Sequence, residues 1–380
     1  MIKVMTVFGT RPEAIKMAPV LLEFSKNKKI DSKIVVTAQH RHMLDQVLSL
    51  FNLKPDADLN IMQKNQTLFD ITSRALTGMG KILDKFSPDI VLVQGDTTSA
   101  FASALAAFYH KIPVGHIEAG LRTDDIHNPY PEEVNRRFVS VVSRLHFAPT
   151  KWAYNNLVKC GIKDNIYITG NTVIDALYYV LKKEKRKHID LIDRIKSKKR
   201  KIIFVEAHRR ENLGSPMHDM CTGLKKIVEK FKDVEIVFSV HKNPKVRETV
   251  YSVLKGIDRV NLLEPLPYPE LVKYLNASYI ILTDSGGIQE EAPSLGKPVL
   301  VLRKTTERPE GIKKGVAVLA GTDTDKIFSL ANKLLTNKKV YLKMSKTMNP
   351  YGDGRAAERI TGIILNYFGE TKKKVKEYKE

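Results

Sequence analysis

The sequence has few cysteines and no long apolar run, and both absences exclude whole classes of protein. Only Cys160 and Cys221 occur, and their spacing fits neither a disulfide framework nor a zinc site, so packing is the expected role of both. No apolar run approaches the roughly 20 residues that a membrane-spanning helix needs. The N-terminus also lacks the small-residue cleavage site of a signal peptide. We therefore expect a cytoplasmic protein without a membrane partner.

The usual glycine loops of nucleotide-binding enzymes are missing as well. No G-x-x-x-x-G-K-[ST] phosphate loop is present. Residues 352–357 (GDGRAA) fit the G-x-G-x-x-G/A pattern, but they follow a proline turn rather than a strand, and too little chain remains for a dinucleotide-binding unit. An NAD or ATP enzyme of the usual kinds is therefore not expected, and the sequence indicates no cofactor and no metal.

Positive charge, in contrast, is abundant. Lysine and arginine total 63 against 42 aspartates and glutamates, which gives a net charge of +21. Such an excess is typical of proteins that bind nucleic acid, a membrane surface or phosphorylated small molecules. Much of it lies in lysine clusters at 182–188, 196–201 and 371–380, which are typical of solvated helix faces and ends. No nucleic-acid module is recognisable, so nucleic-acid binding is only a minor hypothesis.

Short β-branched runs alternate with longer helical patterns along the whole chain, which predicts an α/β fold with parallel strands. The chain of 380 residues fits two domains. We place the first at 1–170 and the second at 171–354, and we expect a C-terminal helix, 355–380, to pack back on the first. The predicted strands cover residues 3–9, 32–38, 89–96, 112–120, 144–150 and 165–170 in the first half, and 201–208, 234–241, 260–265, 279–285 and 297–303 in the second.

Carboxylates follow the strands of the first half. Because ligands of open α/β sheets bind beyond the carboxyl ends of the strands, residues at these ends are the first candidates for a site. Asp96 and Glu118 end two predicted strands, and Glu132 and Glu133 follow a proline into a helix. Glu133 is expected to stabilise that helix. For Asp96, Glu118 and Glu132 we favour proton transfer over helix capping.

Groups suited to phosphate also follow strands. Arg11 and Lys16 come after the first strand, and Ser285, Gly286 and Gly287 begin a predicted helix whose free backbone N–H groups could hold phosphate. The alternative is that Lys16 is a solvated helix lysine and that the serine and glycines merely cap a helix.

Further candidates lie near these positions. Glu291 lies about one turn further along the same helix and could reach a ribose diol, and Arg308 is a second phosphate candidate. His208 and His241 end equivalent strands, which favours a functional role for them.

Long motifs in order along the chain make it similar to a known family. They are GTRPEAIKMAP, QGDTTSAFASALAAFY, HIEAGLRT, PYPEEVNRR, AHRRENLG, VHKNPKVRE, TDSGGIQEEAPSLGKPVLVLR, TTERPEG and NPYGDGRA. Together they resemble the non-hydrolysing UDP-N-acetylglucosamine 2-epimerases over essentially the whole chain. The resemblance implies a GT-B-like fold, in which two Rossmann-like parallel α/β domains face a central cleft. It also implies interconversion of UDP-GlcNAc and UDP-ManNAc, with UDP as a further ligand, no cofactor, and a homodimer.

The chemistry agrees with this resemblance. The C2 hydrogen of a GlcNAc residue is not beside a carbonyl, so a base alone does not easily remove it. Departure of UDP from C1 creates positive character next to C2, and a carboxylate can then take the proton to give 2-acetamidoglucal. Return of UDP with a proton delivered to the opposite face inverts C2. The route needs an acid and a base but no hydride carrier, and the sequence does not say which acid serves which face.

The resemblance also implies roles for individual residues. Asp96, Glu118 and Glu132 would be acid and base groups, with Lys16 and Arg136 nearby and His208 at the diphosphate. The substrate-binding set would comprise Arg11, Lys16, Asp96, Glu118, His208, Ser285, Gly286, Gly287, Glu291 and Arg308. A second nucleotide-sugar site would use Gln39, His40, Gln66 and Arg209. The rival hypotheses are a GT-B glycosyltransferase, a hydrolysing 2-epimerase and a basic nucleic-acid-binding protein.

Overall fold

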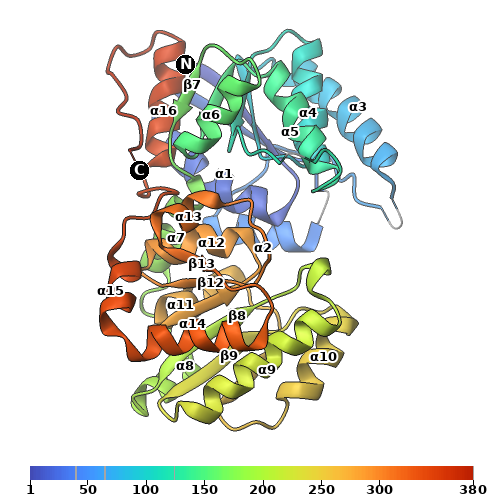
Figure 1. Ribbon diagram of the computed structural model, residues 1–380. Helices are drawn as coiled ribbons and strands as arrows, with labels where there is room; N and C mark the ends of the chain where they lie inside the picture. Colours follow the sequence, from blue (N-terminus) through green and yellow to red (C-terminus); the bar gives the residue numbers. More distant parts are fainter. Residues whose placement is uncertain (39–40, 64–65, 124, 380) are drawn as a thin grey trace. The chain divides into compact units, whose positions relative to one another are not determined.

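The computed structural model describes residues 1–38, 41–63, 66–123 and 125–379, and it folds into two α/β units (Figure 1). Unit 1 comprises Met1–Ala176 and Tyr351–Glu380, and unit 2 comprises Leu177–Pro350. Each unit is built on one sheet in which every strand pair is parallel, as the alternation of apolar and helical segments predicts. The α/β fold class is therefore confirmed.

Unit 1 contains a seven-stranded sheet in the order β3-β2-β1-β4-β5-β6-β7. Its strands are β1 (Ile2–Phe8), β2 (Ile30–Val36), β3 (Ala57–Asp58), β4 (Ile90–Gln94), β5 (Val114–Ile117), β6 (Leu145–Ala148) and β7 (Ile166–Ile168). Its helices are α1 (Arg11–Phe24), α2 (Arg41–Phe51), α3 (Leu68–Phe86), α4 (Thr98–Tyr109), α5 (Glu132–Val142), α6 (Lys151–Lys159) and α16 (Ala356–Tyr367), and α7 (Thr172–Lys183) leads from this unit into the next. The strand order reverses between β1 and β4, which is where ligands bind in sheets of this kind.

Unit 2 repeats the arrangement with six strands in the order β10-β9-β8-β11-β12-β13. Its strands are β8 (Lys201–Glu206), β9 (Val234–Ser239), β10 (Val260–Leu263), β11 (Ile280–Thr283), β12 (Val299–Val301) and β13 (Ala317–Leu319). Its helices are α8 (Asp190–Ser197), η1 (Arg210–Asn212), α9 (Ser215–Lys230), α10 (Pro244–Leu254), α11 (Tyr268–Ala277), α12 (Gly286–Ser294), α13 (Pro309–Lys314), α14 (Thr324–Thr336) and α15 (Lys338–Lys346). Here the order reverses between β8 and β11.

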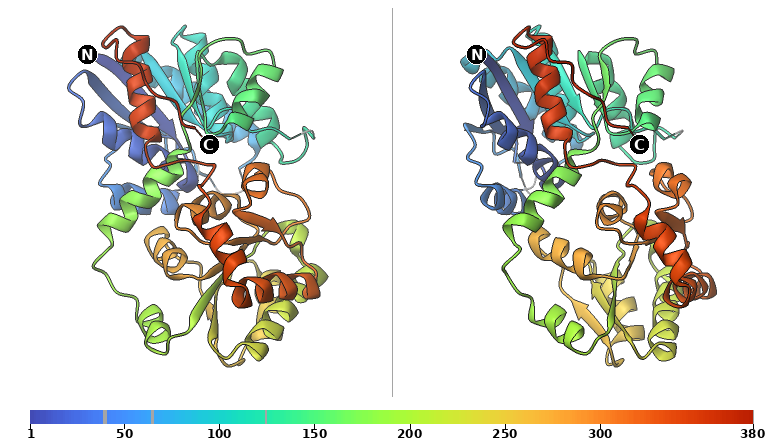
Figure 2. Two further views of the ribbon diagram at one scale, coloured as in Figure 1. Left: turned by 60° about the vertical axis from the view of Figure 1, so that its left-hand side comes forward. Right: turned by 90° about the vertical axis from the view of Figure 1, so that its left-hand side faces the viewer.

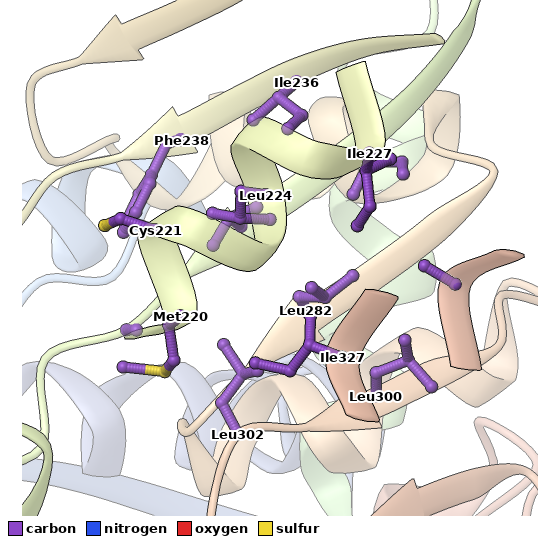
Figure 3. Packing of buried hydrophobic residues seen from close by; sticks show 14 of the residues in the cluster. Met220, Cys221, Leu224, Ile227, Ile236, Phe238, Leu282, Leu300, Leu302 and Ile327 are labelled. Carbon is purple, nitrogen blue, oxygen red and sulfur yellow. The ribbon is translucent and has the colours of Figure 1, made fainter. Parts of the chain in front are cut away.

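The strands of unit 2 are apolar on both faces because helices cover both faces. Figure 3 shows one of these layers, in which α9 contributes Leu224 and Ile227, β9 contributes Phe238, and α14 contributes Ile327. Cys221 lies in the same layer and is fully buried, which confirms a packing role. Cys160, in contrast, is exposed at the end of α6, so the packing prediction is wrong for that residue.

The C-terminal segment belongs to unit 1, where α16 packs against α1. The expected helix over 355–380 is shorter than predicted and ends at Tyr367, because Gly369 adopts a φ of +74° and turns the chain out of the helix. The residues after it return beside α16 (Figure 2), and Tyr378 is buried there with its backbone N–H donating to Ile168 O at 2.8 Å.

Two strands lack a counterpart among the predicted runs. β3 has only two residues, and β13 is a three-residue edge strand, so neither presents enough sequence to be recognised. The passage between the units falls within α7 and next to Pro350, whereas the sequence placed the boundaries at 170 and 354. Among the residues that the structure describes, no helix is long and apolar enough to cross a membrane.

Candidate active site

The loops that follow β1 and β4 are joined by one buried carboxylate. Glu13, in the first turn of α1, accepts hydrogen bonds from Thr10 N at 2.8 Å and from Thr97 Oγ1 at 2.8 Å. Burial is the main reason that the pKa of Glu13 is raised, and its hydrogen bonds oppose that shift. Gly9 lets the turn approach the next loop closely, since a Cβ there would lie 2.0 Å from Thr37 Oγ1. Glu13 therefore positions the strand ends that carry Arg11 and Asp96.

Asp96 lies two residues beyond β4 and pairs with Arg136 of α5. The guanidinium Nε donates to Asp96 Oδ2 at 3.0 Å, and Nη2 donates to the same oxygen. Asn135 Nδ2 donates to the backbone carbonyl of Asp96 at 3.0 Å, so α5 binds both the side chain and the backbone of this residue. Thr97 caps α4 through Ala100 N, so the alternative role for Asp96 as a helix cap is wrong. The pairing leaves about a quarter of the Asp96 side chain exposed.

Glu118 directly follows β5, the neighbour of β4 in the sheet. Its Oε2 accepts hydrogen bonds from Lys16 Nζ and, at 2.8 Å, from Asn171 Nδ2. The Lys16 and Glu118 side chains are 12% and 7% exposed, so this is a buried ion pair, and the reading of Lys16 as a solvated helix lysine is wrong. Glu118 has a φ of +62°, which residues other than glycine rarely adopt and which is found disproportionately at functional sites.

Glu132 and Glu133 begin α5 but differ in their surroundings. Glu133 is fully buried and accepts from Thr123 N at 3.0 Å and from Arg137 Nε at 2.7 Å, which confirms a structural role at this helix end. Glu132 is half-buried at the first position of the helix. Because Asn135 of the same turn is bonded to the Asp96 loop, Glu132 begins a helix that is anchored beside Asp96.

A buried histidine of β5 holds the backbone next to Asp96. His116 Nε2 donates to the carbonyl of Gly95 at 2.8 Å, and burial lowers the pKa of His116 to about 3. The imidazole is therefore neutral at physiological pH and acts as a fixed hydrogen-bond donor. His146 is its register partner on β6, and burial lowers the pKa of that ring to about 4. His116 is therefore a structural support of the loop that carries Asp96.

Unit 2 uses a similar device at its own reversal of strand order. Asp284, directly after β11, is fully buried and accepts from His208 N at 3.0 Å and Arg209 N at 2.9 Å, the residues that follow β8. Asn212 Nδ2 donates to the same carboxylate at 2.8 Å. Like Glu13 in unit 1, Asp284 joins the two loops between which a ligand of such a sheet is expected.

The His208 ring lies between two carboxylates and a second histidine. Its Nδ1 is 3.4 Å from Glu206 Oε1 and 3.7 Å from Asp284 Oδ1. The ring of His241 is stacked on it, with centroids 5.3 Å apart and planes inclined by 21°. The neighbouring Glu206 is the main cause of a raised pKa for His208, whereas burial and the nearby His208 lower the pKa of His241.

The helix α12 presents its N-terminus at the same end of the sheet. Ser285 is the N-cap residue, and Gly286 and Gly287 are the first helical residues, as predicted. A Cβ on Gly286 would lie 3.2 Å from the Arg308 guanidinium, so this glycine gives the arginine room over the helix end. Arg308 Nε donates to Glu290 Oε1 at 2.8 Å. The structure thus brings a helix N-terminus and a guanidinium together, which is an arrangement suited to phosphate.

Glu291 lies further along α12 and is buried. Its Oε1 accepts from the hydroxyl of Tyr268 at 2.6 Å, and the pKa of Tyr268 is raised by burial and by this carboxylate. Arg11, in unit 1, is a half-buried first residue of α1. Each unit therefore holds its predicted residues at the expected ends of strands.

The second predicted site is described only in part. Gln39 and His40 lie outside the described residues. Gln66 is half-buried and accepts from Gln63 N at 3.0 Å, while the Arg209 guanidinium is 3.9 Å from Glu307. Nothing in these contacts tests a second nucleotide site, which stays a prediction.

The sequence did not point to four residues that contact the predicted site residues or their loops. Glu13 had a visible signal, because Thr10 and Glu13 have the T-x-x-E spacing of a capping box. Asp284, Asn171 and Glu206 had none, because each acts on a residue that is remote in sequence or on a neighbouring side chain whose orientation only the fold determines.

Comparison with known proteins places this arrangement in a family. The family model described as UDP-N-acetylglucosamine 2-epimerase matches residues 22–365. The UDP-N-acetylglucosamine 2-epimerase of Bacillus subtilis is 54% identical over 372 residues, covering 98% of this chain and 97% of that protein.

Solved structures agree. The Neisseria meningitidis UDP-GlcNAc 2-epimerase bound to UDP-GlcNAc has a TM-score of 0.88 and 49% identity, over 96% of this chain and all of that one. The Methanocaldococcus jannaschii UDP-GlcNAc 2-epimerase, in complex with UDP-GlcNAc and UDP, has a TM-score of 0.80 and 34% identity, over 96% of this chain and all of that one. The chain therefore belongs to the UDP-N-acetylglucosamine 2-epimerase family.

Proposed function

We propose that this protein interconverts UDP-GlcNAc and UDP-ManNAc without hydrolysing them, by eliminating UDP and adding it back. The observation that carries the proposal is the set of acids at neighbouring strand ends of unit 1, two of which are held by buried cations: Asp96 by Arg136 and Glu118 by Lys16. Family membership supplies the substrate class, and these acids supply the means of moving a proton at C2.

In the elimination step, a carboxylate removes the C2 proton while the bond between C1 and the diphosphate oxygen breaks. The electrons of the C2–H bond form the C1–C2 double bond, and UDP leaves with the electrons of the broken bond. In the return step, a carboxylic acid delivers a proton to the other face of C2 and UDP attacks C1. We assign these transfers to Asp96, Glu118 and Glu132. A dry, pre-ordered pair such as Lys16 with Glu118 suits this work, because its groups need no rearrangement during the reaction.

We assign nucleotide binding in unit 2 to the N-terminus of α12 and its neighbours. Gly286 and Gly287 would offer backbone N–H groups to phosphate, and Arg308 would add a planar cation. Glu291, oriented by Tyr268, would accept from a ribose hydroxyl. His208 would contact the diphosphate, and Arg11 and Ser285 complete the proposed binding set.

Turnover of UDP-GlcNAc in D₂O, followed by NMR, tests the mechanism. Deuterium should enter at C2 and at no other ring carbon, since an accessible carboxyl group exchanges its proton with solvent. Small amounts of UDP and 2-acetamidoglucal should appear when intermediates escape. UDP-ManNAc that keeps its original C2 hydrogen would refute the elimination route.

The same experiment separates the rival functions. A hydrolysing epimerase would release free ManNAc with stoichiometric UDP, and a glycosyltransferase would leave UDP-GlcNAc unchanged until an acceptor is added. A matched control is Glu23→Gln, which removes a carboxylate that is paired with Lys26 on the surface of α1. This variant should epimerise at the normal rate.

We also propose a homodimer formed through α3, α4 and α5. These helices lie side by side on unit 1 (Figure 1). Each of them exposes large apolar side chains. Phe69 of α3 is 88% exposed, and Val141 and Phe138 of α5 are 77% and 51% exposed. Large apolar side chains exposed on adjacent helices are typical of a protein interface. Light scattering should give twice the monomer mass, and Val141→Glu should reduce it. The proposed second nucleotide-sugar site, with Gln39, His40, Gln66 and Arg209, predicts that two molecules of UDP-GlcNAc bind per chain.

A further inference from the structure

Glu206 is the last residue of β8, and it contacts His208, which the proposed function places at the diphosphate. Its Oε1 lies 3.4 Å from Nδ1 of His208. Asp284 Oδ1 lies 3.7 Å from the same nitrogen, and its carboxylate also holds the His208 backbone N–H. Two carboxylates therefore face one edge of the imidazole. Because Nε2 is on the opposite edge of the ring, it points away from them, and a third of the His208 side chain is exposed.

The stacked His241 has a fixed protonation pattern. The backbone N–H of Asn243 donates to His241 Nδ1 at 3.1 Å, so this nitrogen carries no proton. His241 is consequently a neutral ring, in agreement with its lowered pKa. A cationic imidazole stacked on a neutral aromatic ring is favourable, whereas two stacked imidazolium ions would repel each other.

We propose that Glu206 is a positioning residue that keeps His208 as an imidazolium ion, with Nδ1–H toward Glu206 and Asp284 and Nε2–H available to a diphosphate. The proposal rests on the function proposed above, in which His208 meets the diphosphate of the substrate. It adds a residue that touches no substrate but sets the charge of one that does. The benefit is a hydrogen bond from a cation, which is roughly twice as strong as one from a neutral ring.

The charges around this ring determine the direction of the pH effect. Glu206 and Asp284 raise the pKa of His208, and Arg209 and burial lower it. Arg247 lowers the pKa of the stacked His241, and Glu206 and Asp284 raise it. With the pKa of His208 raised, the imidazolium persists to higher pH, and diphosphate binding that depends on it is lost as the pH rises through that pKa. Replacing Glu206 with glutamine should move this loss to lower pH.

The experiment compares the full chain with Glu206→Gln and with a control, Glu229→Gln. Glu229 is an exposed acid of α9 in the same unit, 4.0 Å from Lys225, so the control removes the same charge away from His208. First, NMR of side-chain-labelled histidine, with His208 assigned from a His208→Gln variant, follows the ring titration without ligand. Second, calorimetry measures UDP-GlcNAc binding from pH 5.5 to 8.5. The diphosphate of this ligand is a diester and does not titrate in that range.

The expected result is a downward shift of the His208 titration in Glu206→Gln only. Affinity for UDP-GlcNAc should then fall by up to about tenfold relative to the unmodified chain at pH values between the two His208 titrations, as a charge-assisted hydrogen bond becomes a neutral one, and should be equal at pH values below both titrations. An unshifted His208 titration would overturn the inference, regardless of how UDP-GlcNAc binding changes. A shifted titration with binding that stays independent of pH would instead overturn the placement of His208 at the diphosphate. A loss of affinity that is the same at every pH would indicate a merely structural role and would also refute the proposal.

Discussion

Lys16→Met should reduce both stability and turnover, and the two losses should respond differently to a second substitution. Methionine is an unbranched side chain one atom shorter than lysine, and it carries no charge. Glu118 would then keep the hydrogen bond from Asn171 Nδ2, at 2.8 Å, but would lose the cation that now faces it. Removing one partner of a buried ion pair usually costs about 3–5 kcal/mol. Because the hydrogen bond from Asn171 remains and Glu118 can take up a proton, we expect a loss near the lower limit, about 3 kcal/mol.

The second substitution is Glu118→Gln in the Lys16→Met background, which leaves no buried charge behind. The double variant should be more stable than the sum of the two single losses predicts, with a coupling energy of about 2 kcal/mol, since contacting charged residues typically couple by about 0.5–3 kcal/mol. Turnover should not recover, because the carboxylate that we assign to proton transfer is absent. The single variant Glu118→Gln should lose about a hundredfold in turnover, the usual scale for removing an acid or base group. Lys16→Met should also lower turnover, because it removes the cation that pairs with this carboxylate.

Trp152 makes the stability measurement specific to unit 1. The single tryptophan of the chain, Trp152, is half-buried in α6 of unit 1. Its fluorescence during urea unfolding therefore reports on the unit that contains the Lys16 and Glu118 pair, which matters because a chain of two units need not unfold in one step. A coupling energy near zero, or near-normal turnover in Lys16→Met, would refute the reasoning.

Three further outcomes are expected. The amide variants of Asp96, Glu118 and Glu132 should each lose about a hundredfold in turnover, while their affinity for UDP, measured by calorimetry, stays the same. Normal turnover in one of these variants would mean that its residue takes no part in the mechanism. Arg308→Ala should weaken UDP binding about tenfold or more, because it removes a charge-assisted contact, and unchanged affinity would mean that the nucleotide binds elsewhere. Burial raises the pKa of Asp175, which accepts from the N-terminus of α16, to about 7. The unfolded carboxyl titrates near 4, so between these two values this group lowers the free energy of unfolding of unit 1 by about 1.4 kcal/mol for each unit that the pH rises. Asp175→Asn should make the free energy of unfolding, measured by Trp152 fluorescence, fall less steeply with pH. An unchanged slope would contradict the raised pKa.

The sequence alone determined the α/β class and the ends of the strands that matter. Alternating apolar runs predict parallel strands buried on both faces, because a strand between two layers of helices has no polar face. Glycine, proline and charged residues mark where the strands end. The rule that ligands bind beyond the carboxyl ends of strands needs only these positions, so it can be applied to the sequence alone. Asp96, Glu118 and the start of α12 could therefore be identified as candidates from their positions along the chain.

Tertiary structure decided which partner each of these residues has. Lys16 and Glu118 are 102 positions apart, and the amine reaches the carboxylate only because the sheet places β1 and β5 on either side of β4. The same holds for Arg136 with Asp96, and for Asp284 with the backbone of His208. Glu206 is two residues from His208, yet their contact depends on the direction that each side chain takes past the end of β8. Periodicity and spacing carry information about neighbours along the chain, whereas charge pairing and protonation depend on distances across the sheet, which the fold alone sets.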